Sequence, residues 1–266
     1  MTTYRDGKTL RLAAREGRHT TSTSGHALGY VQANLVVVPE AAAYDFLLFC
    51  QRNPKPCPLL EVVDAGSVEA ARLAPGSDLS RDLPRYRVFR DGKLAEERTD
   101  VSALWQEDFV SFLIGCSFSF DKRLQDAGLE VRNVACGKNV SMYKTNIPTR
   151  RAGRFEGPLV VSMRPFAPGD AIRAATVSAA LPEVHGAPIH LGNPALLGIA
   201  DLSRPDYGDA VPVHEGEIPV FWACGVTPQA VLLQARLPLA ITHAPGHMFV
   251  TDLREERLRE FSERVA

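Results

Sequence analysis

The chain has 266 residues, of which 45% are hydrophobic and 23% are charged. This composition excludes wholesale disorder, because a disordered chain lacks the apolar surface that offsets chain entropy. The 30 basic and 31 acidic side chains give a formal net charge of −1, so no basic excess indicates a nucleic-acid partner. No run approaches about 18 uncharged apolar residues, so neither a membrane-spanning helix nor a membrane partner is expected.

The first 26 residues are polar and charged, and we expect them to form an N-terminal arm. They contain no apolar run of the kind found in secretory signals, so the chain is expected in the cytoplasm. Its five cysteines are then reduced thiols. Because no CxxC pair occurs among them, no structural zinc module is expected.

Apolar periodicity predicts the elements of the first half. Asp91-Gly92 between two alternating runs indicates a hairpin, Asp100 is a candidate helix N-cap, and Gly128 is a candidate helix terminator. The predicted strands are residues 29–39, 59–63, 86–90 and 94–98, and the predicted helices are residues 40–51, 101–113 and 121–127.

The second half is more extended, with loop-rich residues 182–214 and a charged terminal helix in the last fifteen residues. Its predicted strands are residues 159–163, 218–223, 239–243 and 248–251, and its predicted helix is residues 171–181. The mixture predicts an α/β fold in which flanking helices cover mixed sheets. We expect two closely packed lobes, residues 27–150 and 151–266, with one interleaved unit as the alternative.

Two segments share an apolar run, then a pair of cysteine and glycine, then a hydroxyl residue: VSFLIGCS (residues 110–117) and PVFWACGVT (residues 219–227). In the second, Gly225 permits a turn and Thr227 is a candidate N-cap of a helix whose free amides could hold a carboxylate. The alternative is a strand–helix junction without a ligand. Cys116 and Cys224 are candidate nucleophiles or acids, because a helix start can lower the pKa of a thiol. The alternative is a small buried hydrophobe.

Four of the seven histidines lie in two loops rich in glycine and proline, at His185, His190, His243 and His247. Histidine suits acid–base chemistry near neutral pH. The spacing of His243 and His247 resembles a zinc motif, but Pro245-Gly246 breaks the helix that such a motif needs, so no metal is assigned. The alternative is that these rings hydrogen-bond loop backbone.

A further group of side chains suits an anionic ligand. Arg164 ends a predicted strand and can bind a carboxylate through two hydrogen bonds; a structural salt bridge is the alternative. Tyr143 and Lys144 lie together in one segment, and Asn34 lies on a predicted strand where its amide could contact substrate or a neighbouring loop.

Eight segments together resemble the D-glutamate cyclase family. They are GYVQANL (29–35), NPKPCPLLE (53–61), FLIGCSFSF (112–120), MYKTN (142–146), VSMRP (161–165), HGAP (185–188), FWACGVTPQ (221–229) and THAPGHM (242–248). The resemblance spans about residues 14–255. It implies an α/β fold in two packed parts and a lyase that closes D-glutamate to 5-oxo-D-proline. Ser141 and Asn193 depart from the family pattern, in which proline and aspartate are usual, and Asn193 puts a catalytic acid at that position in doubt.

Cyclisation of this kind needs a base for the α-amine, for which His190 or His243 is the candidate, and a proton for the departing water, from a histidine or Cys116. Amides near Gly225 and Thr227 would stabilise the oxyanion, and Arg164 with Lys144 would hold the α-carboxylate. No cofactor is expected, and a homo-oligomer is left open. Two alternatives remain: a racemase that uses Cys116 and Cys224, and a non-catalytic protein that binds acidic metabolites.

Overall fold

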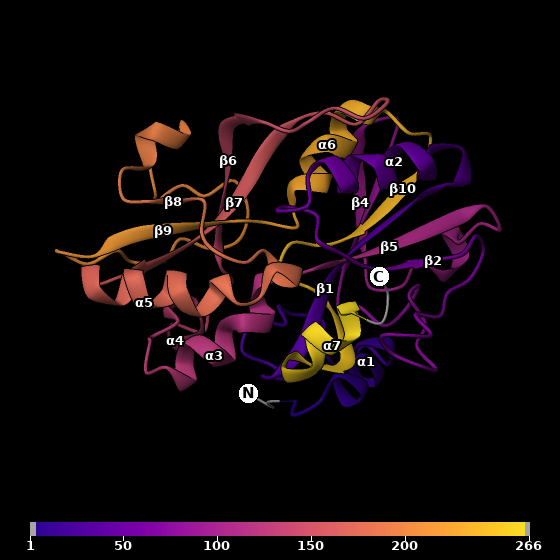
Figure 1. The fold of residues 1–266 in the computed structure, drawn as a ribbon. Coiled ribbons are helices and arrows are strands. Elements are labelled where there is room, and N and C mark those ends of the chain that lie inside the picture. The colour runs from indigo at the N-terminus through magenta and orange to yellow at the C-terminus, as the bar shows by residue number, and fades with distance from the viewer. Residues whose placement is uncertain (1–3, 264–266) are drawn as a thin grey trace.

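The computed structural model describes residues 4–263 and contains two antiparallel sheets that lie side by side (Figure 1). The large sheet has the order β2-β5-β1-β10-β3-β4, with β11 also paired to β1; the small sheet has the order β6-β7-β9-β8. The strands of the large sheet are β1 (Tyr30–Pro39), β2 (Leu59–Val63), β3 (Tyr86–Arg90), β4 (Lys93–Arg98), β5 (Phe109–Gly115), β10 (Ala240–His243) and β11 (Phe249–Arg254). Those of the small sheet are β6 (Ser141–Pro148), β7 (Pro158–Phe166), β8 (His190–Leu191) and β9 (Ile218–Ala223).

Helices cover both sheets, so the predicted α/β class is confirmed. In Figure 1, α2 and α6 lie above the large sheet, α1 and α7 lie below it, and α5 lies below the small sheet. The helices are α1 (Gly7–Arg15), α2 (Glu40–Arg52), α3 (Asp121–Asp126), α4 (Arg132–Ala135), α5 (Pro168–Ala179), α6 (Thr227–Ala235) and α7 (Leu258–Glu263). None of them is long and apolar enough to cross a bilayer, in the part of the chain that is described.

Most local patterns correspond to the elements that they predicted. Strands β2 and β9 have the predicted bounds, and α2 extends one residue beyond the predicted helix. The β3–β4 hairpin turns at Asp91 and Gly92, whose φ angles of +49° and +76° are those of the turn type that Asp-Gly favours.

The helix predicted over residues 101–113 is wrong. Asp100 does accept the Ser102 amide at 2.8 Å, but the residues that follow form a short 3₁₀ turn, Ser102–Leu104, whose N-cap position is Val101. The following residues form β5, which pairs with β1 on one side and β2 on the other and is buried along its whole length. Pairing on both edges outweighs a local capping signal, because it buries the aromatic and β-branched side chains of this run.

The chain crosses between the sheets, so a division at residue 150 does not separate them. Strand β6 precedes that point but belongs to the small sheet, where it pairs with β7. Strands β10 and β11 come late in the chain but pair with β1 in the large sheet. The described part of the N-terminal arm contains α1, which is fixed to β11 by two hydrogen bonds from Arg11 to Asp252 at 2.8 and 3.0 Å.

The main apolar core is shared by both sheets. Trp222 and Phe166 of the small sheet belong to the same buried cluster as Leu35 and Leu113 of the large sheet. Trp222 is fully buried, and its indole N–H donates to the Ser178 hydroxyl at 3.0 Å. Burial of each such side chain stabilises the fold by about 1.5–3 kcal/mol. The shared core therefore holds the two sheets in a fixed arrangement.

Candidate functional site

The two thiols singled out in the sequence lie in one cluster between the sheets. Cys116 directly follows β5 and Cys224 directly follows β9, and both pack with Val160 and Met142 of the small sheet. Both thiols are more than nine-tenths buried. The repeated order of apolar run and cysteine therefore corresponds to two strand ends that meet.

Asn34 of β1, in the large sheet, lies against Gly225, in the turn that follows β9 of the small sheet. The Asn34 amide donates to the carbonyl oxygens of Ile114 and Gly115 at 3.2 and 2.7 Å. A Cβ atom at position 225 would lie 2.0 Å from Asn34 Nδ2, so glycine is required for the turn after β9 to approach β1. The amide of Asn34 thus holds the end of β5 in place.

Arg164 of β7 lies next to the thiols and is completely buried. Its Nη2 donates to Asp121 Oδ1 at 2.8 Å and to the Ser117 hydroxyl at 3.2 Å, and its guanidinium carbon lies 5.6 Å from the centre of the Trp222 ring. The arginine therefore makes the structural ion pair that the sequence left as an alternative.

Two atoms of this ion pair are buried without a hydrogen-bond partner in residues 4–263. They are Asp121 Oδ2, an acceptor, and Arg164 Nε, a donor. An unpaired buried polar atom costs about 1–3 kcal/mol, and such atoms concentrate where a ligand or water completes the structure. Asp121 was assigned only as the first residue of a helix in the sequence, and its pairing with a strand 43 residues away could not be seen there.

Burial governs the acid–base properties of the cluster. It raises the pKa of Asp121 to about 6, although Arg164 acts to lower it. It raises the pKa of Cys224 to about 11 and that of Cys116 well above its usual range. The lowered thiol pKa expected at a helix start is therefore wrong, because loss of hydration of the thiolate exceeds the effect of the Phe118 amide.

The start of α6 also differs from the expectation. Val226 occupies the N-cap position, and the buried Thr227 hydroxyl instead accepts the Val160 amide at 3.0 Å and donates to the Cys224 carbonyl at 2.7 Å. The amides of Thr227 and Gln229 are bonded to main-chain carbonyl oxygens. Thr227 thus ties β7 to α6, and these two amides are not free for a carboxylate.

The loop histidines bond to backbone. His243 is fully buried, its Nδ1 lies 3.2 Å from the Leu35 carbonyl oxygen, and burial lowers its pKa to about 3. His190 Nε2 lies 2.9 Å from the Asn193 carbonyl oxygen, and His185 Nδ1 lies 2.9 Å from that of Lys55. This is the structural alternative that the sequence left open.

His190 and Tyr143 lie on the opposite face of the small sheet from the thiols. Tyr143 packs in a separate cluster with Phe221, and the His190 ring lies 5.9 Å from the Phe221 ring. The Tyr143 hydroxyl donates to the Leu202 carbonyl at 2.7 Å. The structure therefore does not bring these two residues to Cys116.

Lys144 lies on the thiol side of β6 but nearer the surface. Its ammonium is 3.7 Å from Asp206 Oδ1 and 5.5 Å from the centre of the Tyr207 ring. Tyr207 packs against the thiol cluster, and burial raises the pKa of its phenol to about 12. Sequence reasoning missed Tyr207, which lies in a loop with no local motif.

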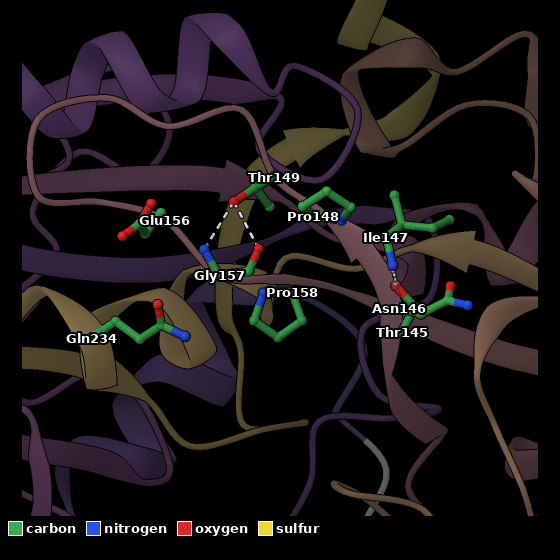
Figure 2. A pocket seen from close by; sticks show the side chains of 9 residues that line it. All are labelled: Thr145, Asn146, Ile147, Pro148, Thr149, Glu156, Gly157, Pro158 and Gln234. Atoms are coloured by element: carbon green, nitrogen blue, oxygen red, sulfur yellow. Dashed lines mark hydrogen bonds between the residues drawn. The ribbon is translucent and has the colours of Figure 1, made fainter.

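Two hollows of about 310 Å³ lie near the small sheet. Figure 2 shows the first, at the end of β6 and the start of β7, where Glu156 and Gln234 lie on one side and the strand residues Asn146 and Ile147 on the other. Its lining includes no residue of the predicted site. The second lies between β6 and the loop of residues 198–206, and Tyr143, Lys144, Arg204 and Asp206 are among the residues that line it.

Comparisons with known proteins place the chain among close relatives. The sequence model of the D-glutamate cyclase family matches residues 110–252. "Putative hydro-lyase GK2103" of Geobacillus kaustophilus is 57% identical over 94% of this chain and 95% of its own length. Similarly named proteins of Bordetella pertussis and Rubrobacter xylanophilus are 59% and 61% identical, over 96% and 91% of this chain and 92% and 93% of their own lengths. A nitrogen repressor-like protein of Methanococcus jannaschii aligns over 92% of this chain and 98% of its own at 11% identity, with a TM-score of only 0.36.

Proposed function

Because this chain belongs to the D-glutamate cyclase family, we propose that it is a hydro-lyase that closes D-glutamate, or a closely related acidic amino acid, to 5-oxo-D-proline and water. The observation that carries the proposal is its identity of 57–61% to proteins named as hydro-lyases over more than nine-tenths of its length. The buried cluster of Cys116, Cys224, Asp121 and Arg164 is the reaction site that we assign to it.

The reaction forms one N–C bond and breaks one C–O bond. Two protons leave the ammonium nitrogen, and both end on the oxygen that departs as water. Because amine and acyl carbon belong to one molecule, the enzyme has mainly to hold the folded conformer and move these protons.

Asp121 is the residue that we assign to proton transfer. Its Oδ2 is unpartnered, and a carboxyl with a pKa of about 6 can accept and return a proton near neutral pH. Arg164 Nε–H, the other unpartnered atom, would hold a substrate carboxylate. Cys116 and Cys224 would act as neutral thiols, since burial raises the pKa of both.

Substrate access requires a covering segment to move, because Arg164 and Asp121 are buried. Residues 182–186 are the segment that we assign to this motion. The Glu183 carbonyl oxygen lies against Gly115, 2.0 Å from where a Cβ atom would stand, and His185 has a left-handed φ of +84°. Such a backbone conformation is strained for histidine and is common in segments that change conformation during function.

The direct test is mass spectrometry of D-glutamate and L-glutamate incubated separately with the purified chain. We expect loss of one water from the D enantiomer. Asp121→Asn should lower turnover by about 10²–10⁴-fold, the usual contribution of a general acid–base group. Asp126→Asn is the matched control, because Asp126 belongs to the same helix but is exposed and paired with Lys122. Loss of water from neither enantiomer would refute the substrate assignment, and equal loss of activity in both variants would refute the role of Asp121.

One observation favours a second candidate, a racemase: Cys116 and Cys224 lie in the same cluster. A two-thiol racemase needs one thiolate as base, and the raised pKa of both thiols opposes this. Turnover in heavy water separates the two reactions. Deuterium at the α-carbon without loss of water would support the racemase, whereas dehydration with retention of the α-hydrogen supports the lyase.

A further inference from the structure

The second hollow carries charges of both signs. It has a volume of about 310 Å³ and is lined by Tyr143, Lys144, Gly198, Ile199, Ala200, Asp201, Arg204 and Asp206. Lys144 and Arg204 contribute cations, and Asp201 and Asp206 contribute anions. The volume is at the small end of the range for small-molecule sites, about 300–1,000 Å³.

Of the two cations of this hollow, Lys144 forms a long ion pair with the lining residue Asp206, and Arg204 is unpaired among the described residues. Lys144 Nζ is 3.7 Å from Asp206 Oδ1, which is too long for a hydrogen bond. Arg204 makes no ion pair with a carboxylate of residues 4–263 within 4.0 Å. Asp201 accepts the amide and hydroxyl of Ser203 at 2.8 and 2.7 Å, and these bonds lower its pKa and keep it ionised.

The walls of the hollow are fixed to β6 at three points. The Tyr143 hydroxyl donates to the Leu202 carbonyl, the Lys144 amide donates to Asp206 Oδ2 at 2.9 Å, and Met142 and Tyr207 exchange two backbone hydrogen bonds at 2.9 and 3.1 Å. A site built in this way loses little freedom when a ligand binds, which favours affinity.

Tyr207 lies between the hollow and the thiol cluster. Its ring is within 5.5 Å of the Lys144 ammonium and packs against the cluster that contains Cys224. Arg87 of β3 lies on the same ring, with its guanidinium carbon 5.9 Å from the centre. Tyr207 therefore contacts one residue that lines the hollow, Lys144, and also the thiol cluster of the reaction site that we assigned.

We propose that this hollow binds the zwitterion of a free α-amino acid, with Arg204 and Lys144 on its carboxylate and Asp201 and Asp206 on its ammonium. The inference rests on the proposed function only for the identity of the amino acid, D-glutamate. It predicts discrimination between substrate and product. The product, 5-oxo-D-proline, keeps the carboxylate but has no ammonium, so it loses the two aspartates as partners and binds more weakly.

Calorimetric titration of the full chain with D-glutamate and with 5-oxo-D-proline tests the inference. We expect Arg204→Gln to weaken binding of both compounds by about tenfold or more, the loss expected for one charge-assisted hydrogen bond. Asp201→Asn should weaken D-glutamate binding by a similar factor and leave 5-oxo-D-proline binding unchanged. Arg259→Gln on α7, where the side chain is 86% exposed, is the matched control and should change neither affinity.

The outcomes separate this inference from the proposed function. Binding of D-glutamate that Arg204→Gln weakens, without turnover, supports the hollow and refutes the lyase. Turnover of D-glutamate, together with calorimetric affinities that neither Arg204→Gln nor Asp201→Asn changes, refutes the hollow and leaves the lyase standing. Equal effects of Asp201→Asn on both compounds also refute the zwitterion site. Lys144→Gln provides a second variant, with the same expectation as Arg204→Gln, if one substitution prevents folding.

Discussion

Removal of Arg164 should destabilise the protein in a way that depends on pH. Arg164 and Asp121 form an ion pair of 2.8 Å in which both side chains are essentially inaccessible to water. Removing one partner of such a pair leaves a buried charge without compensation and typically costs about 3–5 kcal/mol. Arg164→Met keeps much of the side-chain volume, so we expect a loss of this size in the free energy of unfolding at pH 8.5.

The pH dependence follows from the pKa of Asp121. An acid whose pKa is raised by folding contributes stability that is present at pH values below its unfolded pKa and is lost as the pH rises through its folded pKa. In the wild type this loss is nearly complete by pH 6.5, because the folded pKa is about 6. Without Arg164 the folded pKa rises further, so the loss continues to higher pH. The cost of Arg164→Met should then grow between pH 6.5 and 8.5 by up to about 1.4 kcal/mol per pH unit.

Urea unfolding at the two pH values measures this cost, with two further variants for comparison. In Arg164→Met/Asp121→Asn no carboxyl remains to titrate at this site, so the growth with pH should vanish and most of the stability should return. Arg173→Met is the matched control, because Arg173 and Asp170 are also 2.8 Å apart but exposed, and such pairs contribute about 0–1 kcal/mol. The reasoning fails if Arg164→Met costs no more than Arg173→Met, or costs the same at pH 6.5 and pH 8.5.

Three further predictions concern neighbouring features. Gly225→Ala should lower the free energy of unfolding by about 1–3 kcal/mol, measured by thermal unfolding, because the added Cβ would meet Asn34. Gly169 has open space around it, so Gly169→Ala should cause no such loss. Equal stability of the two variants would contradict the close approach of Gly225 to Asn34. Burial holds the pKa of His243 at about 3, so His243 contributes stability that is present above pH 6.5 and is lost as the pH falls. In a His243→Gln variant the free energy of unfolding should therefore fall less steeply with decreasing pH. An unchanged dependence on pH would show that His243 does not titrate on unfolding. Iodoacetamide should label only Cys136 in the native protein, because the other four cysteines are buried. Peptide mass spectrometry identifies the labelled cysteines. Modification of Cys116 would show that its cluster opens to solvent.

The sequence predicts elements well where neighbouring residues determine them. The Asp91-Gly92 turn fixes its hairpin because both residues must take positive φ angles, and few other pairs do so readily. Strand β9 is bounded by loop residues on both sides and carries an uninterrupted apolar run. Strand β5 is equally apolar, but Asp100, upstream of it, accepts a main-chain amide as a helix cap does. Only the positions of β1 and β2 on its two edges determine that the run forms a strand, and these strands are distant in sequence.

The candidate site was predictable to the extent that it depends on strand ends. The shared pattern around Cys116 and Cys224 marks two strands that end in the same layer, and the structure places the thiols in one cluster. The pattern does not reveal the face on which a neighbouring side chain lies. Tyr143 precedes Lys144 by one residue, and this single step places the two on opposite faces of β6.

Residue type alone is a poor guide to function where the folded main chain itself needs hydrogen-bond donors and acceptors. Loops built from glycine and proline leave carbonyl oxygens without a strand partner, and a histidine ring nitrogen can satisfy one of them, as His190 does for Asn193. A residue type selects candidates, but function depends on which polar atoms remain unpartnered after the chain has folded. In this site those atoms are Asp121 Oδ2 and Arg164 Nε. They belong to one ion pair, which forms because α3 follows the large sheet while β7 belongs to the small one, and no sequence window contains both.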